Sequence, residues 1–372
     1  MSLEQQIRLP LRDSFAGIEP YGAPQLDVDV AINVNENPYP VPEPVIAAIT
    51  AAVRETASSL NRYPDRDFLA LRRALSEYLA QESGVSFEPD WLWAGNGSNE
   101  VMAHLFTAFG GQGHPALSAS PTYSMYPEYA RDTDTELIDV PRREDFSLDM
   151  PAFREAILEA HPAMVVLASP NNPTGTQLPL DQVAELLELT RDTDPKRSAT
   201  VVVIDEAYIE FRRDGVPSSL ELLAHHPHLV VTRTMSKAFA MAGLRLGYLV
   251  AHPQIVKKLQ VVRLPYHLST LTQAAAIAAL HSADLLQSQV AQIRATRDYM
   301  VTRLRDMGFT VADSDTNFVF FGRFPDRQKV WQDLLDRSVL IRAVGPEGWL
   351  RASVGTESET QRFFAALEEV VK

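Results

Sequence analysis

The stretch Thr232-Arg233-Thr234-Met235-Ser236-Lys237-Ala238-Phe239-Ala240-Met241-Ala242-Gly243-Leu244-Arg245-Leu246-Gly247-Tyr248 contains the residue around which the fold and the chemistry are arranged. It follows the apolar run Leu229-Val230-Val231, which is typical of a short buried strand. An isolated loop lysine is usually solvated at the surface, and that is the ordinary interpretation of Lys237. The residues around Lys237 favour a functional interpretation instead, because three of them carry hydrogen-bond donors that suit a phosphate dianion: Thr234, Ser236 and Arg245.

Lys237 is therefore a candidate nucleophile toward a carbonyl group. Such an amine must be deprotonated near neutral pH, which burial or a neighbouring cation can bring about. A lysine that forms a Schiff base beside a phosphate site is what pyridoxal phosphate requires. This cofactor is the working hypothesis.

The composition limits the classes of function. A formal net charge of −14 over 372 residues disfavours a general nucleic-acid or anionic-membrane surface. The absence of cysteine excludes disulfides, thiolate metal sites and cysteine nucleophiles. No apolar run approaches the roughly 18–20 residues that span a bilayer, and Met1-Ser2-Leu3-Glu4-Gln5-Gln6 does not begin a secretory signal. We expect a cytoplasmic enzyme without a metal, a membrane partner or a nucleic-acid partner.

Three apolar runs in the middle of the chain are each followed by a polar candidate residue. The runs at residues 164–168, 201–204 and 229–231 precede, in this order, Asn172, Asp205 and Lys237. Wholly apolar, β-branched runs are typical of a parallel sheet that is buried on both faces. Because ligands bind beyond the carboxyl ends of such strands, we expect these three side chains to converge.

A further phosphate contact is predicted where a strand-like segment, residues 91–94, runs into Gly95-Asn96-Gly97-Ser98-Asn99-Glu100 and an apolar helix at residues 101–109. This order places free backbone N–H groups and the positive end of a helix at Ser98 and Asn99. Capping of the helix by Ser98, with Glu100 nearby, is the commoner use of such residues and is the alternative.

A bound pyridoxal ring would need a carboxylate to keep its nitrogen protonated, and Asp205 stands at the end of an apolar strand where it could supply one. Asn172 and Tyr208 could donate hydrogen bonds to the phenolic oxygen of the ring, and Tyr123 could stack on it. Each residue also has a structural interpretation. Asp205 could cap a turn, Asn172 could hold one, and the tyrosines could belong to the core. Their combination favours a cofactor site.

The chain is long enough for more than one domain. We predict an N-terminal arm that contributes to a small domain at residues 1–34, a large cofactor-binding domain at residues 35–262 and a small C-terminal domain at residues 263–372. Tyr21 in the arm could either pack the arm onto the body or contact a substrate.

The motifs resemble, in order, those of class II pyridoxal-phosphate aminotransferases, and nearly the whole chain is similar to the histidinol-phosphate aminotransferase family. The lysine segment 234–243 carries the signature, and the other matching segments are residues 35–40, 61–64, 95–100, 121–123, 170–175 and 205–208. Single motifs are common to many fold-type I enzymes, whereas the ordered set is specific to the superfamily. The resemblance implies an α/β, aspartate-aminotransferase-like fold with a mostly parallel seven-stranded sheet flanked by helices, plus a smaller α+β domain.

The resemblance also implies roles at the cofactor. Lys237 would hold pyridoxal 5'-phosphate and move a proton, Asp205 would pair with the ring nitrogen, and Asn172 with Tyr208 would contact the phenolic oxygen while Tyr123 stacks. The cofactor phosphate would be bound by Ser98, Asn99, Thr234, Ser236 and Arg245. Tyr63 would reach the phosphate of the neighbouring subunit, which makes a homodimer part of the site. Leu244 departs from the family, in which a glycine is common before the arginine.

On the substrate side, the resemblance implies that Arg351 binds a carboxylate in one half-reaction and the substrate phosphate in the other. Its implied companions are Tyr21, Asn35, Glu36 and Arg342. The implied reaction is transamination between L-histidinol phosphate and 2-oxoglutarate, which gives imidazole-acetol phosphate and L-glutamate in histidine biosynthesis.

Three alternatives share the fold, since fold alone does not determine substrate. The first is an aromatic aminotransferase acting on phenylalanine or tyrosine. The second is a decarboxylase of a phosphorylated amino acid. The third is a non-catalytic regulator, which would usually carry a DNA-binding segment, and neither end of this chain shows a basic helical extension.

Overall fold

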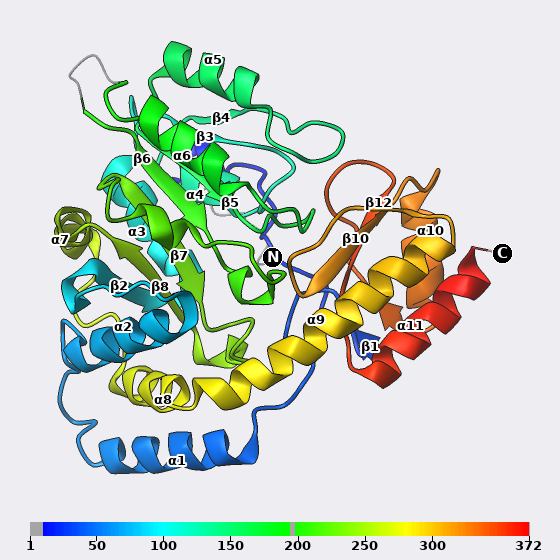
Figure 1. Cartoon of the computed structure of the whole chain (residues 1–372), viewed down its shortest axis with the longest axis horizontal. Coiled ribbons are helices and arrows are strands. Elements are labelled where there is room, and N and C mark those ends of the chain that lie inside the picture. Colours follow the sequence, from blue (N-terminus) through cyan, green and yellow to red (C-terminus); the bar gives the residue numbers. More distant parts are fainter. Residues whose placement is uncertain (1–9, 194–197, 372) are drawn as a thin grey trace, which may run out of the picture.

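The computed structural model describes residues 10–193 and 198–371. Its largest element is a seven-stranded sheet in the order β2-β8-β7-β6-β5-β3-β4 (Figure 1). The strands are β2 (Leu92–Asn96), β3 (Ala116–Ser118), β4 (Leu137–Asp139), β5 (Met164–Ala168), β6 (Val201–Asp205), β7 (Leu229–Thr234) and β8 (Leu246–Ala251). β8 is antiparallel to both of its neighbours, and the other pairs are parallel. The predicted sheet is confirmed.

The centre of this sheet is buried on both faces. Every residue of β5, β6 and β7 is buried, as their continuous apolar and β-branched runs predict. The register pairs Ala168 with Asp205 and Asp205 with Thr232, so the three strands end at one level. The residues that follow each strand therefore meet at one edge of the sheet.

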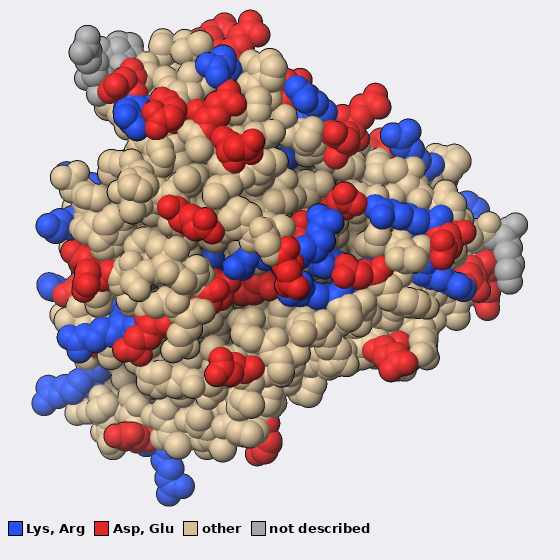
Figure 2. Space-filling view, viewed as in Figure 1, with Lys and Arg blue, Asp and Glu red and all other residues tan. Residues whose placement is uncertain are grey.

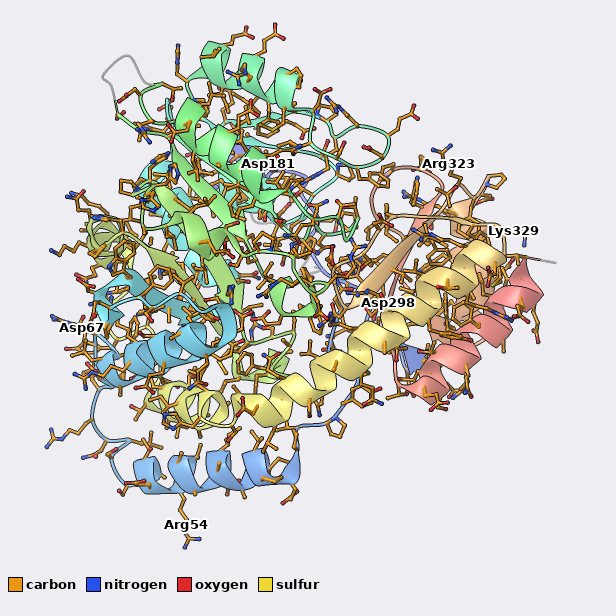
Figure 3. All side chains as sticks on the ribbon, viewed as in Figure 1. Arg54, Asp67, Asp181, Asp298, Arg323 and Lys329 are labelled. Atoms are coloured by element: carbon orange, nitrogen blue, oxygen red, sulfur yellow. The ribbon has the colours of Figure 1, made fainter. Side chains whose placement is uncertain are left out.

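Helices surround the sheet. They are α1 (Glu43–Ala57), α2 (Leu69–Ser83), α3 (Gly97–Phe109), α4 (Tyr126–Asp132), α5 (Met150–Ala160), α6 (Leu180–Leu189), α7 (Pro253–Val262) and α8 (Thr270–Leu280). α3 packs on β2, β7 and β8, while α8 packs on both α1 and α2. Pro44 lies in the first turn of α1, where its missing N–H leaves no hydrogen bond unmade. Figure 3 shows Arg54 of this helix pointing away from the rest of the molecule.

The rest of the chain forms a smaller α+β unit, coloured mainly orange and red in Figure 1. Its antiparallel sheet has the order β12-β10-β9, built from β9 (Thr310–Val311), β10 (Phe318–Gly322) and β12 (Trp349–Ser353). The helices α10 (Arg327–Leu335) and α11 (Glu357–Val370) pack on each other. β1 (Val30–Ala31), in the N-terminal arm, pairs with β11 (Val339–Leu340) and so ties the arm to this unit. The predicted α+β part is confirmed.

The two units are joined by the long helix α9 (Ala283–Asp306), which Figure 1 shows running from α8 to the smaller sheet. α8 packs on α1 and α2 and so belongs to the larger unit, whereas α9 packs on β9 and β10 of the smaller one. Toward its C-terminus, the chain therefore passes from one unit to the other along α9. The predicted domain boundaries after residues 34 and 262 stay predictions.

The surface carries charges of both signs. Figure 2 shows acidic and basic side chains interspersed over the visible face, without a broad basic area. Within the described part of the chain, no helix is both long and apolar enough to cross a membrane. Residues 10–193 and 198–371 also contain no cluster of three or more His, Asp or Glu side chains suited to a metal ion.

Candidate active site

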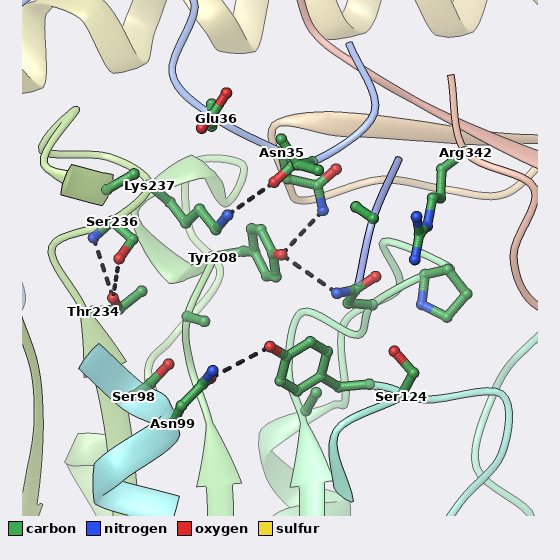
Figure 4. Close-up of a pocket in the computed structure, with 18 of the residues that line it drawn as sticks. Asn35, Glu36, Ser98, Asn99, Ser124, Tyr208, Thr234, Ser236, Lys237 and Arg342 are labelled. Atoms are coloured by element: carbon green, nitrogen blue, oxygen red, sulfur yellow. Dashed lines mark hydrogen bonds between the residues drawn. The ribbon is translucent and has the colours of Figure 1, made fainter. Parts of the chain in front are cut away.

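A cavity of about 530 Å³ opens where β5, β6 and β7 end (Figure 4). Apart from Tyr63, all the residues predicted for the site line it: Tyr21, Asn35, Glu36, Ser98, Asn99, Tyr123, Asn172, Asp205, Tyr208, Thr234, Ser236, Lys237, Arg245, Arg342 and Arg351. They come from the N-terminal arm, from the edge of the large sheet and from the smaller unit. The fold therefore brings these candidates together, and their individual roles stay predictions.

Lys237 follows β7 and points into the cavity (Figure 4). Its Nζ donates a hydrogen bond to the main-chain oxygen of Val34, 3.1 Å away. Removal from bulk water, together with the charge of Arg351, lowers the pKa of the amine to about 8, and Glu36 partly opposes this shift. An appreciable fraction of the amine therefore lacks its proton near neutral pH, as attack on a carbonyl requires.

Asp205 is the last residue of β6, and its side chain is buried. Three neutral groups donate hydrogen bonds to its carboxylate: the hydroxyl of Tyr126 at 3.0 Å, the hydroxyl of Thr232 at 3.0 Å and the N–H of Ala207 at 3.2 Å. Burial raises the pKa of Asp205 to about 6, and the hydrogen bonds act in the opposite direction. The contact with Ala207 means that Asp205 also caps the turn after its strand.

Tyr208 directs its hydroxyl into the cavity with a defined hydrogen-bond pattern (Figure 4). Its oxygen accepts from Nδ2 of Asn35 at 3.0 Å and from Nδ2 of Asn172 at 3.4 Å. Because a hydroxyl that accepts two hydrogen bonds still has its own proton to donate, Tyr208 can donate to an acceptor inside the cavity. The arrangement fits the predicted contact with a phenolic oxygen.

Ser98 and Asn99 lie in the first turn of α3, which begins earlier than the expected residue 101. Asn96 occupies the cap position, and Glu100 accepts hydrogen bonds from both the N–H and the side chain of Asn96, at 2.6 and 2.9 Å. The alternative that Ser98 caps this helix is therefore wrong. Its hydroxyl lines the cavity at the positive end of α3, where an anion is stabilised.

The loop after β7 faces that helix end. Oγ1 of Thr234 accepts from the N–H of Ser236 at 3.1 Å, which makes a tight hydroxyl-lined turn. Arg245 lines the cavity beside this turn, and its Nη1 donates to the main-chain oxygen of Ala242 at 3.1 Å. A methyl group at Gly97 would come within 2.5 Å of Nη2 of Arg245, so any larger residue would force the guanidinium away from its present position. Leu244 is accommodated next to Arg245, which adopts a positive φ of 58°.

Arg351 and Arg342 bring positive charge from the smaller unit. Their main chains pair, with N–H to O distances of 2.8 and 2.9 Å, so the two arginines lie side by side. Arg351 is buried and donates to Oδ1 of Asn172 at 2.6 Å and to the main-chain oxygen of Asn33 at 2.8 Å. Burial lowers the pKa of Arg351 to about 10, but the guanidinium stays charged near neutral pH. Neither arginine is ion-paired with a carboxylate in the described structure, which leaves their charge free for an anionic ligand.

The remaining predicted residues have less defined positions for a ligand. Tyr123 lines the cavity, and its hydroxyl donates to Oδ1 of Asn99 at 3.4 Å. Tyr21, half of which is exposed, shares a hydrogen bond of 2.9 Å with Ser124. Asn35 uses both ends of its side chain internally, because its Oδ1 accepts from Ser353 at 3.0 Å while its Nδ2 holds Tyr208.

Tyr63 is the predicted residue that lies outside the cavity. Its side chain is 81% exposed and stacks on Tyr266, with 4.6 Å between ring centroids. A large aromatic side chain left so exposed is consistent with a partner surface, which the prediction of a neighbouring subunit requires.

Sequence reasoning missed Tyr126 and Thr232, which bond directly to Asp205, and the main-chain oxygen of Val34, which receives the lysine. Thr232 directly follows the predicted strand at residues 229–231, and extending the alternation of that strand by one residue could have shown its direction toward Asp205. Tyr126 resembled a core aromatic, and a main-chain oxygen leaves no signal in the sequence.

Comparison with known proteins decides the family. The model of aminotransferase class I and II matches residues 29–367. The chain belongs to the aminotransferase class I and II family. A histidinol-phosphate aminotransferase of Thermobifida fusca is 55% identical over 96% of this chain and 95% of its own length. One from Bifidobacterium adolescentis is 52% identical, over 98% and 96%.

Solved structures agree with this aminotransferase assignment. A histidinol-phosphate aminotransferase of Sinorhizobium meliloti, in complex with pyridoxal-5'-phosphate, has a TM-score of 0.81 and 26% identity, and the match covers 92% of this chain and 91% of that one. A mutant aspartate aminotransferase of Thermus thermophilus has a TM-score of 0.80 and 25% identity, covering 96% and 98%. The predicted resemblance and fold are confirmed.

The cavity of this aminotransferase fits pyridoxal phosphate by the chemistry of its donor set. A buried carboxylate without a cationic partner in the described chain, Asp205, suits a protonated ring nitrogen. The guanidinium of Arg245 lies against Gly97 at the start of α3. Together with the hydroxyls of the cavity, it suits the phosphate. Lys237, whose pKa is lowered, suits the aldehyde.

Proposed function

We infer that this protein is a pyridoxal-phosphate-dependent aminotransferase that transfers an amino group between L-histidinol phosphate and 2-oxoglutarate. The observation that carries this assignment is one cavity, lined by a buried lysine of lowered pKa and by two arginines that no described carboxylate pairs with, in a chain at least half identical to curated histidinol-phosphate aminotransferases. These relatives favour the predicted reaction over the aromatic aminotransferase, the decarboxylase and the non-catalytic regulator.

Pyridoxal phosphate supplies an aldehyde that captures the substrate amine and a conjugated ring that delocalises electrons from the substrate Cα. Lys237 would hold it at the aldehyde. Its Nζ, once exchanged for the substrate amine, can accept the Cα proton and return it, since its pKa is matched to near-neutral conditions. Asp205 would hold a proton at the ring nitrogen, and Tyr208 would donate one hydrogen bond to the phenolic oxygen.

Arg351 and Arg342 orient the substrate. The two half-reactions bring different anions to the same cavity, a carboxylate from glutamate and a phosphate ester from histidinol phosphate. A guanidinium binds either group through paired N–H donors. The neighbouring Arg342 adds a second charge, as the dianionic phosphate ester requires, so one arginine pair can serve both substrates.

A panel of separate half-reactions tests the assignment. Single-turnover spectra would be recorded with glutamate, histidinol phosphate and phenylalanine as amino donors. We expect kcat/KM for histidinol phosphate to exceed that for phenylalanine by more than about tenfold, because only the former engages both arginines with a dianion. Equal or better turnover of phenylalanine and phenylpyruvate would assign the protein to the aromatic aminotransferases instead.

The proposed enzyme is a homodimer with a shared site. Tyr63 and Tyr266 lie on a surface that also exposes the apolar side chains of Leu60 and Leu264. This surface borders the cofactor site, because Asn96, at the start of α3, donates to the main-chain oxygen of His267 at 2.9 Å. A second copy that covers these residues would place its Tyr63 near the phosphate-binding end of α3.

A further inference from the structure

The carboxylate of Asp205 is fixed from two sides by residues that none of the sequence motifs identifies. The hydroxyl of Tyr126, on α4, donates to Oδ2, and the hydroxyl of Thr232, on β7, donates to Oδ1, each at 3.0 Å. Tyr126 and Thr232 are fully buried, so water does not compete for these hydrogen bonds. Each carboxylate oxygen thus has its own hydroxyl donor from a different element.

No Lys or Arg among the described residues forms an ion pair with Asp205 that could replace these donors. The titratable groups that interact with it are Tyr123 before α4, Tyr126 and Tyr129 on α4, Tyr208 after β6, and Glu206, whose negative charge disfavours a second charged carboxylate. Burial raises the pKa of Asp205 most strongly, the charge of Glu206 adds to this, and hydrogen bonds from Tyr126, Thr232 and Ala207 lower it. Without the two hydroxyls, neutral Asp205 would persist to higher pH.

We propose that Tyr126 and Thr232 are positioning residues that keep the Asp205 carboxylate charged and aimed at the ring nitrogen of the cofactor. The proposal rests on the proposed function, in which Asp205 pairs with that nitrogen. Tyr126 also meets Tyr123 edge to face, with 5.7 Å between centroids and an interplanar angle of 90°. The side chain of Tyr126 therefore contacts both the carboxylate of Asp205 and Tyr123, the tyrosine predicted to stack on the ring.

Removing either hydroxyl has a spectroscopic consequence. A charged Asp205 keeps the ring nitrogen protonated, and the resulting positive charge withdraws electrons from the conjugated ring. This lowers the pKa of the nitrogen that links the ring to Lys237. If Asp205 loses a hydroxyl donor and is less often charged, the pKa of this linking nitrogen is lowered less. The pH midpoint of the visible absorption change of the holoenzyme then moves upward.

The test compares Tyr126→Phe and Thr232→Val with two matched variants. Tyr129→Phe is the control for the first, because Tyr129 lies on the same helix and is also buried, yet its hydroxyl has no hydrogen-bond partner among the described residues. Thr232→Ser keeps the hydroxyl and is the rescue variant for the second. For each holoenzyme the visible spectrum is titrated, and for each apoenzyme the dissociation constant of pyridoxal phosphate is measured.

We expect the midpoint to rise by about one pH unit and cofactor affinity to fall about tenfold in Tyr126→Phe and Thr232→Val, with Tyr129→Phe and Thr232→Ser close to wild type. Should Tyr126→Phe fail to fold, the Thr232 pair decides alone. If both hydroxyl deletions match their controls while the wild type titrates normally, the positioning role is overturned and the proposed function stands. A wild type that binds no pyridoxal phosphate would overturn the function and this inference together.

Discussion

The chemistry at the residue scale depends on how far Lys237 is removed from water. Its pKa of about 8, set mainly by desolvation, lies well below that of a solvated lysine. Only the neutral amine attacks an aldehyde. The rate at which the apoenzyme incorporates pyridoxal phosphate should therefore rise with pH and level off above about pH 8, as stopped-flow absorbance would measure.

The sign of this dependence follows from the lowered pKa. Below the pKa the amine is protonated and unreactive, and each pH unit upward increases the neutral fraction until the midpoint is passed. A rate that continued to rise to about pH 10.5 would mean that Lys237 titrates like a solvated lysine.

Arg351 is the residue proposed to bind the anionic group of both substrates. Its replacement in Arg351→Ala removes a buried guanidinium whose charge no carboxylate in the described chain balances. We expect kcat/KM to fall at least about a hundredfold, or about 3 kcal/mol, in both half-reactions. Arg54→Ala, on the outer face of α1, is the control and should leave both unchanged. Loss confined to one half-reaction would contradict the shared anion site.

Single residues differ in how far sequence could predict them. Lys237, Asp205 and Asn172 were predictable, because Asp205 ends an apolar strand of the parallel sheet and the other two lie within a few residues of the ends of theirs. Tyr126 was not, since a buried tyrosine in a helix looks the same whether its hydroxyl packs or bonds. Asn35 was expected beside the substrate, yet its side chain is engaged by Tyr208 and Ser353.

At the scale of elements, the proposed phosphate site depends on the close approach of α3 to the loop before β8. Gly97 makes this possible, and the variant Gly97→Ala tests it. Gly97 and Gly113 share a φ of +78°, but a methyl group would meet Arg245 at 2.5 Å only at Gly97, whereas Gly113 has open space. Both alanine variants should lose about 1 kcal/mol of stability from the backbone conformation.

Cofactor affinity separates the two variants. We expect the dissociation constant of pyridoxal phosphate, from equilibrium titration of the apoenzymes, to rise at least about tenfold in Gly97→Ala and little in Gly113→Ala. An equal effect in both would show that strain, and not the contact with Arg245, limits binding.

Element types were predictable from the apolar pattern, and their ends were less so. The strand β5 was predicted at its observed bounds because its apolar run is sharply delimited. The start of α3 was expected at residue 101, since its first turn is polar and lacks periodicity, but the helix begins at Gly97. Those first residues are the ones that line the cavity.

At the scale of the whole molecule, the site joins segments that are far apart in the chain. The arm reaches the smaller unit through β1 and β11, and Lys237 bonds to the main chain at Val34. The sequence contains no signal for these long-range pairs, because they arise from tertiary packing of polar main chain. The resemblance to known aminotransferases supplied what local pattern could not.

The shared dimer site can be tested by mixing two inactive variants. If Tyr63 acts on the neighbouring subunit, a dimer of one Lys237→Ala chain and one Tyr63→Ala chain contains one site with both residues intact. We expect mixed, refolded dimers to regain activity that neither variant shows alone. No recovery, despite heterodimers seen by native mass spectrometry, would place Tyr63 in its own subunit's site or outside catalysis.

The central claim is that Lys237 holds pyridoxal phosphate at the edge of the large sheet. It is tested most directly by reducing the holoenzyme with borohydride and mapping the labelled peptide by mass spectrometry. The account predicts the pyridoxyl group on the peptide containing Lys237 and none on the exposed Lys257 and Lys258 of α7. A label on another lysine, or no label in an enzyme that turns over glutamate, would contradict it.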